Sequence, residues 1–234
     1  MDCLVKKPNT NIIIQARVLS KRLPGKLFFN FFNSEIIHRI IKISKSINGI
    51  NKIILATSKN NENSVLKKIC NDNQIIFFND HKDEENVFER YQYAIRKYPC
   101  DYFIRMTADN YLMQPILFKK LLTLTFKGNY DYSFIKPLSH FCGEIVRSEV
   151  FINRKLKTKL EREHVTWGLR NDKLIKKLEL PSNFNGINHN SPIVLDTIED
   201  LYLMKNIEQK FPKFRNVNCI KELISIQRND ATGR

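Results

Sequence analysis

The chain has 234 residues, of which 42% are hydrophobic and 27% are charged. This composition is typical of a globular protein, and no segment approaches the roughly 20 consecutive apolar residues that cross a bilayer, so we expect no membrane partner. The net charge of +15 suggests binding to nucleic acid. Lysine and arginine are scattered in runs no longer than a pair, however, so we expect no nucleic-acid partner and instead a preference for anionic small molecules.

The five cysteines are odd in number and form no C-x-x-C pair, which argues against a disulfide framework and a zinc site. His140 and Cys142 have the spacing of two metal ligands, but no second pair follows, so core or loop filling is the favoured interpretation. At the N-terminus, Lys6 and Lys7 follow a short apolar patch, which reverses the order of a signal peptide. We therefore expect a cytoplasmic protein with reduced cysteines, folded as one domain over residues 1–234.

Short apolar segments alternate along the chain with longer segments of helical period. The predicted strands and helices are, in turn, 11–15, 52–57, 74–78, 102–106 and 131–135, and 34–46, 61–71, 83–97 and a helix opened by Pro115. Apolar strands that each lead into a helix form a mostly parallel sheet covered on both faces. The sequence therefore predicts an α/β fold.

The loop after the first predicted strand, residues 15–26, reads Q-A-R-V-L-S-K-R-L-P-G-K and is polar and basic. Its backbone N–H groups together with Arg17, Arg22 and Lys26 supply donors and positive charge for a triphosphate. A basic loop in this position is also typical of an ordinary surface turn. The order of strand, loop, Pro24-Gly25, lysine and helix favours phosphate binding, because open α/β sheets bind ligands at the carboxyl ends of their strands.

Two aspartates follow apolar segments at the same kind of position. Asp109 comes after the predicted strand 102–106, and Asp196 follows Ile193-Val194-Leu195. Two carboxylates delivered to one edge of the sheet can hold Mg²⁺, which takes its remaining ligands from water and substrate phosphates. The alternative is that each aspartate caps a helix or lies in a turn, as the acidic residues after Asp196 suggest.

The segment Glu161-Arg-Glu-His-Val-Thr166 places a histidine beside two glutamates. His164 could act as a general base, but it could also form a surface pair with Glu161 on a short helix. Arg162 is an equally good candidate for binding an acidic substrate. The residues alone leave these alternatives open.

Five segments, taken in order, resemble the cytidylyltransferase family of CMP-Kdo synthetases, acylneuraminate cytidylyltransferases and, most similar here, the spore-coat polysaccharide type. That family typically reads Q-A-R-x-G-S-x-R-L-P-G-K, E-D-V-L-x-R-Y, R-I-T-G-D-C-P-L-x-D-P, E-R-E-H-V-T and V-D-T-P-E-D-L. The matching segments in this chain are 15–26, 85–91, 105–115, 161–166 and 195–201. The resemblance extends over residues 11–210.

The resemblance implies a Rossmann-like nucleotidyltransferase fold and transfer of CMP from CTP to a sugar, sugar acid or small phosphorylated acceptor, with release of pyrophosphate, for surface polysaccharide. It implies Lys26, Arg17 and Asp109 as catalytic residues, with Asp109 and Asp196 as ligands of a Mg²⁺ cofactor. The residues it assigns to the nucleotide are Gln15, Ala16, Arg17, Ser20, Arg22, Lys26 and Thr107. Those it assigns to an acidic acceptor are Arg90, Arg105, Glu144, Arg162 and His164. It also implies a homodimer, and leaves open whether the nucleophile is a phosphate or a hydroxyl.

Two departures from the family pattern bear on binding. Leu19 replaces a glycine in the basic loop, where a side chain restricts how closely the backbone approaches a phosphate. Cys142 takes the place of an aspartate that commonly faces the acceptor in the family, while Glu144 is kept. We therefore expect an acceptor unlike the commonest one in the family, or reduced activity.

Two other functions are compatible with the same scaffold. A glycosyltransferase would use a finished sugar nucleotide, but such an enzyme needs no basic cradle for a triphosphate after the first strand. A non-catalytic basic protein would bind polyanions in a salt-sensitive manner that does not depend on Asp109.

Overall fold

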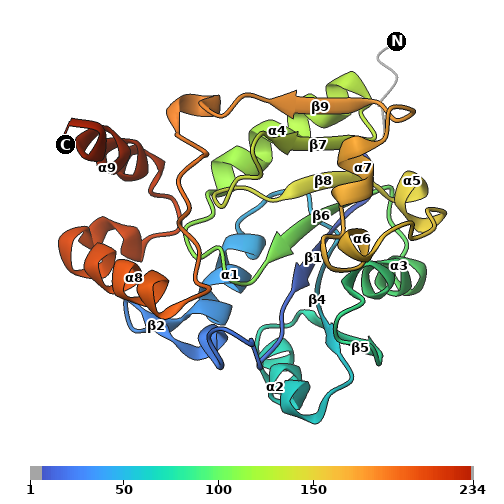
Figure 1. Ribbon diagram of the computed structural model, residues 1–234, viewed down its shortest axis with the longest axis horizontal. Coiled ribbons are helices and arrows are strands. Elements are labelled where there is room, and N and C mark those ends of the chain that lie inside the picture. Colours follow the sequence, from blue (N-terminus) through green and yellow to red (C-terminus); the bar gives the residue numbers. More distant parts are fainter. Residues whose placement is uncertain (1–6, 233–234) are drawn as a thin grey trace.

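A computed structural model describes residues 7–232, with side chains to Gln227, so the N-terminal residues 1–6 used for the predicted location lie outside it. Its centre is a seven-stranded sheet in the order β5-β4-β1-β6-β8-β7-β9 (Figure 1). The strands are β1 (Thr10–Gln15), β4 (Lys52–Ser58), β5 (Ile76–His81), β6 (Tyr102–Thr107), β7 (Tyr132–Ile135), β8 (Glu144–Arg147) and β9 (Lys177–Leu180). Only β8 runs against its neighbours, so the predicted mostly parallel sheet is confirmed.

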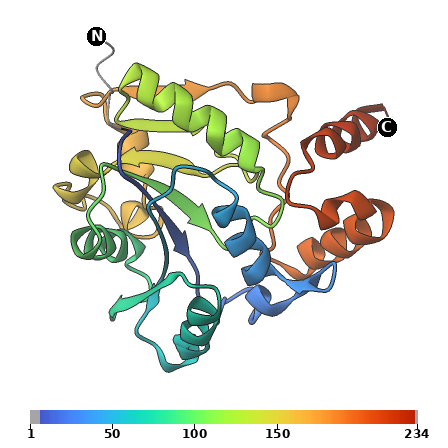
Figure 2. The ribbon, with the colours of Figure 1, turned by 180° about the vertical axis from the view of Figure 1, so that it is seen from behind.

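Successive side chains of a strand point to opposite faces, and β1 shows how this builds two cores. Ile12 and Ile14 belong to the core beneath α1 (Ile36–Lys45), α2 (Val65–Asp72) and α4 (Pro115–Gly128), the face turned to the viewer in Figure 2. Ile13 belongs to the opposite core, under α3 (Val87–Lys97), α5 (Ser148–Ile152) and α7 (Trp167–Asn171). The helices therefore cover both faces, and the predicted α/β fold is confirmed.

The segment after the basic loop differs from the prediction of a helix over 34–46. Asn30–Phe31 (β2) and Ser34–Glu35 (β3) form a short antiparallel hairpin, and α1 begins only at Ile36. The two residues between the strands, Phe32 and Asn33, have φ of 52° and 59°. Positive φ at both positions is the geometry of a tight hairpin turn, which ordinary helical periodicity does not reveal.

The chain reverses its direction of travel across the sheet at β1. It proceeds from β1 to β4 and β5 on one side and then returns to β6 on the other. Ligands of open α/β sheets bind at such a switch point, beyond the carboxyl ends of the strands. The basic loop after β1 and Asp109 after β6 therefore start from adjacent strands at this edge.

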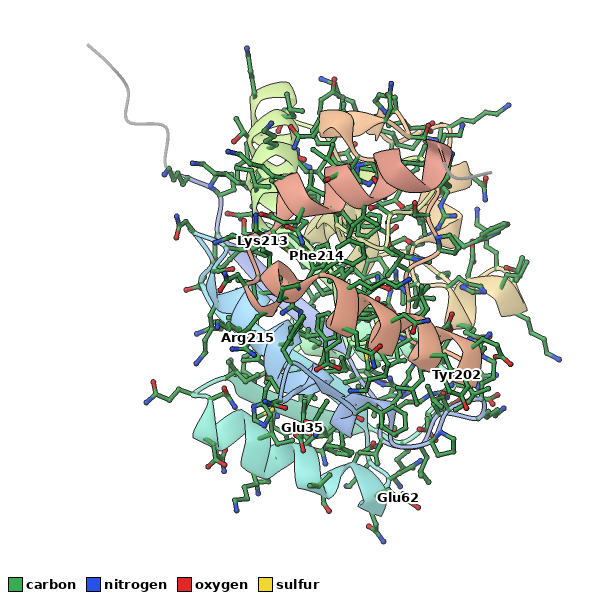
Figure 3. All side chains as sticks on the ribbon, turned by 90° about the vertical axis from the view of Figure 1, so that its left-hand side faces the viewer. Glu35, Glu62, Tyr202, Lys213, Phe214 and Arg215 are labelled. Carbon is green, nitrogen blue, oxygen red and sulfur yellow. The ribbon has the colours of Figure 1, made fainter. Side chains whose placement is uncertain are left out.

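The C-terminal third supplies the elements beyond this edge. The helix α6 (Lys159–Glu163) precedes β9 and lies beside α3, whereas α8 (Ile198–Lys210) and α9 (Ile220–Thr232) follow the last strand and lie beyond the carboxyl ends of the strands (Figure 1). Figure 3 looks onto that edge, with Tyr202 on α8 and Phe214 in the following turn, Pro212–Arg215. Arg39 of α1 fastens this turn by donating to the carbonyls of Arg215 and Asn216. Within residues 7–232 no helix is long and apolar enough to span a membrane.

Candidate functional site

The basic loop closes back on itself and delivers a lysine to the carboxyl edge of the sheet. The Gly25 N–H donates to the Val18 carbonyl at 3.0 Å, and Gly25 adopts a φ of 69°, which a residue without Cβ takes at little cost. Lys26 then begins a short 3-10 helix, Lys26–Phe28, and its side chain is only 10% exposed. The turn therefore aims the lysine inward rather than into solvent.

Lys26 lies between the two predicted metal-binding aspartates. Its Nζ is 2.5 Å from Oδ1 of Asp196 and 3.1 Å from Oδ2 of Asp109. Arg22 adds a second cation, with Nη2 2.6 Å from Oδ2 of Asp196. The Leu195 N–H donates to the Asp109 carbonyl at 3.0 Å, which ties the two acidic segments together. Residues from three separate parts of the chain thus form one cluster of alternating charge.

Neither aspartate is a helix N-cap, although Asp109 lies in a turn, as the alternative interpretation allowed. Thr197 is the N-cap of α8 and forms a capping box with Asp200. The carboxylate of Asp200 also accepts from the Asp196 N–H at 2.9 Å. Asp109 lies in the turn after β6, and the next helix has Gln114 as its N-cap. The carboxylates of Asp109 and Asp196 therefore cap no helix, and both face the cations.

The cluster stabilises the charged form of a buried carboxylate. Burial raises the pKa of Asp109, but Lys26 and a hydrogen bond from Thr107 outweigh burial, so the pKa lies below its usual value. Asp109 is therefore ionised at neutral pH. Together the two aspartates offer four carboxylate oxygen atoms at one edge, the kind of donor set that binds Mg²⁺.

The other residues predicted for the nucleotide lie on β1, β6 and the loop between β1 and Lys26. Gln15 ends β1 and accepts from Arg105 at 3.4 Å, and the Ala16 N–H donates to the Ala56 carbonyl at 3.3 Å. Ser20 is buried, whereas Arg17 is half-buried. Leu19 is 50% exposed, so the side chain that replaces the family glycine is not packed into the core.

A pocket of about 200 Å³ opens beside the two aspartates. It is lined from β6 and its following turn by Arg105, Thr107 and Asp109, and from the segment before α8 by Asp196. Its remaining wall comes from β7, β8 and the loop between them: Phe134, Leu138, His140, Cys142 and Glu144. The predicted metal ligands and part of the predicted acceptor side therefore border one cavity.

An ion pair forms the floor of this pocket. Arg105 Nη1 donates to Oε2 of Glu144 at 2.7 Å. The other carboxylate oxygen of Glu144 accepts from the Tyr132 hydroxyl and, at 2.6 Å, from the Thr166 hydroxyl. Burial raises the pKa of Glu144, but Arg105 and the two hydroxyls outweigh burial and hold the pKa below its usual value. Three hydrogen-bonding groups thus keep one buried negative charge in a fixed position.

Three residues predicted for the acceptor do not line this pocket. Arg90 is buried and donates to the Glu84 carbonyl at 2.6 Å, so it fixes the loop before α3. Arg162 pairs with Asp83 of the same loop. His164 is exposed at the end of α6, where its N–H donates to the Leu160 carbonyl. Arg162 thus links α6 to the loop before α3, which the linear motif could not distinguish from substrate binding.

The sequence pattern allowed His140 as a metal ligand but favoured core or loop filling, and it did not indicate Tyr132 or Thr166 as site residues. Within residues 7–232, no group of three or more His, Cys, Asp or Glu side chains is arranged to hold a metal ion. His140 instead lines the pocket, and its buried Nδ1 has no hydrogen-bond partner there. The available signal was the difference from the family pattern around Cys142, which pointed to this loop but gave His140 no role in binding an acceptor.

The sequence of this chain is similar to those of known proteins. A family model described as cytidylyltransferase matches residues 11–228. The spore coat polysaccharide biosynthesis protein SpsF of Bacillus subtilis is 28% identical over 229 residues, covering 93% of each chain. An uncharacterized protein of Methanocaldococcus jannaschii is 30% identical over 207 residues, covering 85% of this chain and 83% of its own. The resemblance inferred from the five motifs is thus confirmed.

Solved structures support the fold. A cytidylyltransferase from Leptospira borgpetersenii superposes with a TM-score of 0.79 at 21% identity, covering 96% of this chain and 95% of the other. A CMP:2-keto-3-deoxy-manno-octonic acid synthetase complexed with CTP gives a TM-score of 0.65 at 15% identity, covering 87% of this chain and 100% of the other. The predicted nucleotidyltransferase fold is confirmed.

Proposed function

Because the chain belongs to the cytidylyltransferase family and is a nucleotidyltransferase, we propose that it transfers CMP from CTP to a small sugar-type acceptor. An acceptor oxygen attacks the α-phosphorus, the bond to the bridging oxygen of the β-phosphate breaks, and pyrophosphate leaves. The observation that carries the proposal is the position of Lys26 between Asp109 and Asp196, next to a pocket of small-molecule size. The similarity to SpsF supports a role in polysaccharide biosynthesis.

Lys26 and the basic loop account for triphosphate binding and charge stabilisation. Lys26 is buried and has two carboxylate partners, so its ammonium is held in place without reorganisation when negative charge develops nearby. Arg22 is largely exposed and reaches the outer oxygen of Asp196, where it can also meet the leaving phosphates. Arg17 supplies a further cation from the same loop. Catalysis then consists mainly of positioning and charge stabilisation.

The donor set fits the predicted metal. Both aspartates approach the same ammonium group within 3.1 Å, so their oxygen atoms lie within reach of one shared cation. Asp109 and Asp196 would hold Mg²⁺, which takes one or two carboxylates and completes its coordination with water and phosphate oxygens. When bound, the metal would neutralise charge on the triphosphate.

We infer that the protein carries out this transfer reaction in the cytoplasm. That the protein forms a homodimer stays a prediction.

The test is pyrophosphate release with each of the four nucleoside triphosphates, Mg²⁺ and a panel of sugar phosphates, sugar acids and small phosphorylated metabolites. Release with CTP and one acceptor supports the proposal and names the acceptor. Failure of CTP to bind at millimolar concentration, measured by calorimetry on the folded protein, would contradict it.

A further inference from the structure

The charges that line the pocket restrict what an acceptor can carry into it. Among the described residues, Arg105 is the one cationic side chain that lines the cavity, against the carboxylates of Asp109, Asp196 and Glu144. The Arg105 guanidinium is already engaged at Nη1 by Glu144 at 2.7 Å and at Nη2 by Gln15 at 3.4 Å, and only its buried Nε has no partner in the described part of the chain. A carboxylate placed beside Glu144, away from Lys26 and Arg22, would meet a guanidinium whose charge Glu144 already balances. Burying such an unpaired charge is strongly unfavourable.

Part of the pocket lining is apolar. Its side chains are Met113, Phe134, Ile135, Leu138 and Cys142. Cys142, which stands where the family commonly has an acceptor-facing aspartate, contributes a small apolar group instead of a charge. This apolar part suits the carbon face of a ligand. At about 200 Å³ the cavity is smaller than the roughly 300–1,000 Å³ of typical ligand pockets, so the group that enters it is small.

His140 has a buried polar atom without a protein partner in residues 7–232, as does Arg105 at its Nε in the same pocket. It lies on the loop between β7 and β8, and no hydrogen bond within the described residues satisfies its buried Nδ1. Buried polar atoms are rarely left without a partner, and a bound ligand is one common source of the missing bond. Burial lowers the pKa of His140, although Asp109, Asp196 and Asp200 raise it, so the ring is neutral at pH 7. A neutral imidazole offers one donor and one acceptor, as a hydroxyl does.

We propose that the acceptor enters this pocket with an uncharged, hydroxyl-bearing end and that His140 is the hydrogen-bonding contact for that hydroxyl. The inference rests on the proposed function and specifies its substrate class. An acidic group on the acceptor is confined to the reacting end, near Lys26 and Arg22. The pocket therefore excludes acceptors that carry a carboxylate on the end that enters it.

The first test compares acceptors that differ by a single carboxylate. Suitable pairs are a hexose phosphate with the matching hexuronic acid phosphate, glycerol phosphate with phosphoglycerate, and a hexose with its hexuronic acid. We expect pyrophosphate release with at least one acceptor that lacks the carboxylate. Release with its carboxylated partner should be at least about tenfold slower. Equal or faster release with the carboxylated member overturns the inference. The inference is also overturned if the protein binds CTP but releases no pyrophosphate with any acceptor that lacks the carboxylate. A protein that does not bind CTP contradicts the proposed function itself.

The second test changes His140. His140→Ala should raise the acceptor KM about tenfold, the loss of one hydrogen bond in a closed site, and leave the Kd of CTP unchanged. His140→Gln, whose amide both donates and accepts, should recover part of the loss. His140→Arg adds a cation. It should raise pyrophosphate release with carboxylated acceptors relative to the matching acceptors that lack the carboxylate. His38→Ala is the matched control, since His38 lies on α1 with a side chain 41% exposed.

An unchanged acceptor KM in His140→Ala overturns the role of this residue. A lower affinity for CTP in the same variant would instead indicate a general disturbance of the site. In that case His140→Gln decides, because a purely structural role predicts no preferential recovery of the acceptor KM.

Discussion

Lys26 and Asp196 are separated by 170 positions along the chain, yet Nζ of one and Oδ1 of the other lie 2.5 Å apart. The contact joins the loop after the first strand of the sheet to the segment that precedes α8. It forms because both segments end at the same edge, where Asp109 completes the cluster. Each part of this cluster has a distinct expected role, and the variants below separate them.

Lys26→Met removes the buried cation while keeping a side chain of similar length. We expect pyrophosphate release to fall by about a hundredfold or more, because a preorganised charge near the reacting phosphate is lost. Steady-state kinetics with CTP and the identified acceptor measures the effect. Arg22→Met removes the more exposed cation and should reduce pyrophosphate release by a smaller factor. Equal losses in the two variants would contradict the special position of Lys26.

Asp109→Asn and Asp196→Asn should each reduce release by about a hundredfold or more while the protein remains folded, because the metal and Lys26 lose a charged partner. Circular dichroism checks the fold, and Mg²⁺ titration of the residual activity checks the metal. A requirement for higher Mg²⁺ supports ligation by the substituted aspartate. Variants with wild-type activity and Mg²⁺ dependence would rule it out.

Thr197→Ala tests the separation between capping and metal binding. The substitution removes the N-cap of α8 and should lower the free energy of unfolding by about 1 kcal/mol. Denaturant unfolding measures this loss. Because the Asp196 carboxylate faces Lys26 rather than the helix, turnover at a temperature where the variant is folded should stay close to that of the parent. A hundredfold loss of turnover would mean that the cap also positions Asp196.

Glu144 gives the protein a predictable response to acid. Its folded-state pKa is depressed below its ordinary value of 4.5. The stabilisation it provides is therefore fully present above about pH 5 and is lost as pH falls through 4.5 towards the depressed value. Denaturant titrations between neutral and acidic pH should show this decline. Glu144→Gln should weaken the decline and, by leaving Arg105 buried without its partner, lower stability at neutral pH by about 3 kcal/mol.

Gly25→Ala tests the turn that presents Lys26. A Cβ at this position meets nothing within 4 Å, so the cost comes only from the positive φ of 69°. We expect a loss of about 1 kcal/mol in the free energy of unfolding and a higher KM for CTP, because the loop relaxes away from its turn. Gly25→Asn should be milder, since asparagine tolerates a left-handed backbone better than alanine. Equal effects of the two substitutions would contradict backbone strain as the cause.

The sequence by itself determined the central strands, the positions of Lys26, Asp109 and Asp196, and the order of the family motifs. These features are local, because apolar runs, turn residues and polar strand ends are visible in short segments. For the same reason the sequence missed β8 and β9, and the predicted first helix included Ser34–Glu35, which form the second strand of the hairpin. Short strands and tight turns depend on their pairing partners rather than on their own pattern.

Only the tertiary structure decided which polar residues meet. It paired Arg105 with Glu144, gave Arg90 and Arg162 to the loop before α3, and left His140 facing the pocket without a partner. It also assigned the cap of α8 to Thr197, which freed Asp196 for Lys26. A charged side chain looks the same in a linear motif whether it binds substrate or a neighbouring loop. The difference lies in long-range packing, which fixes the direction and the burial of each group.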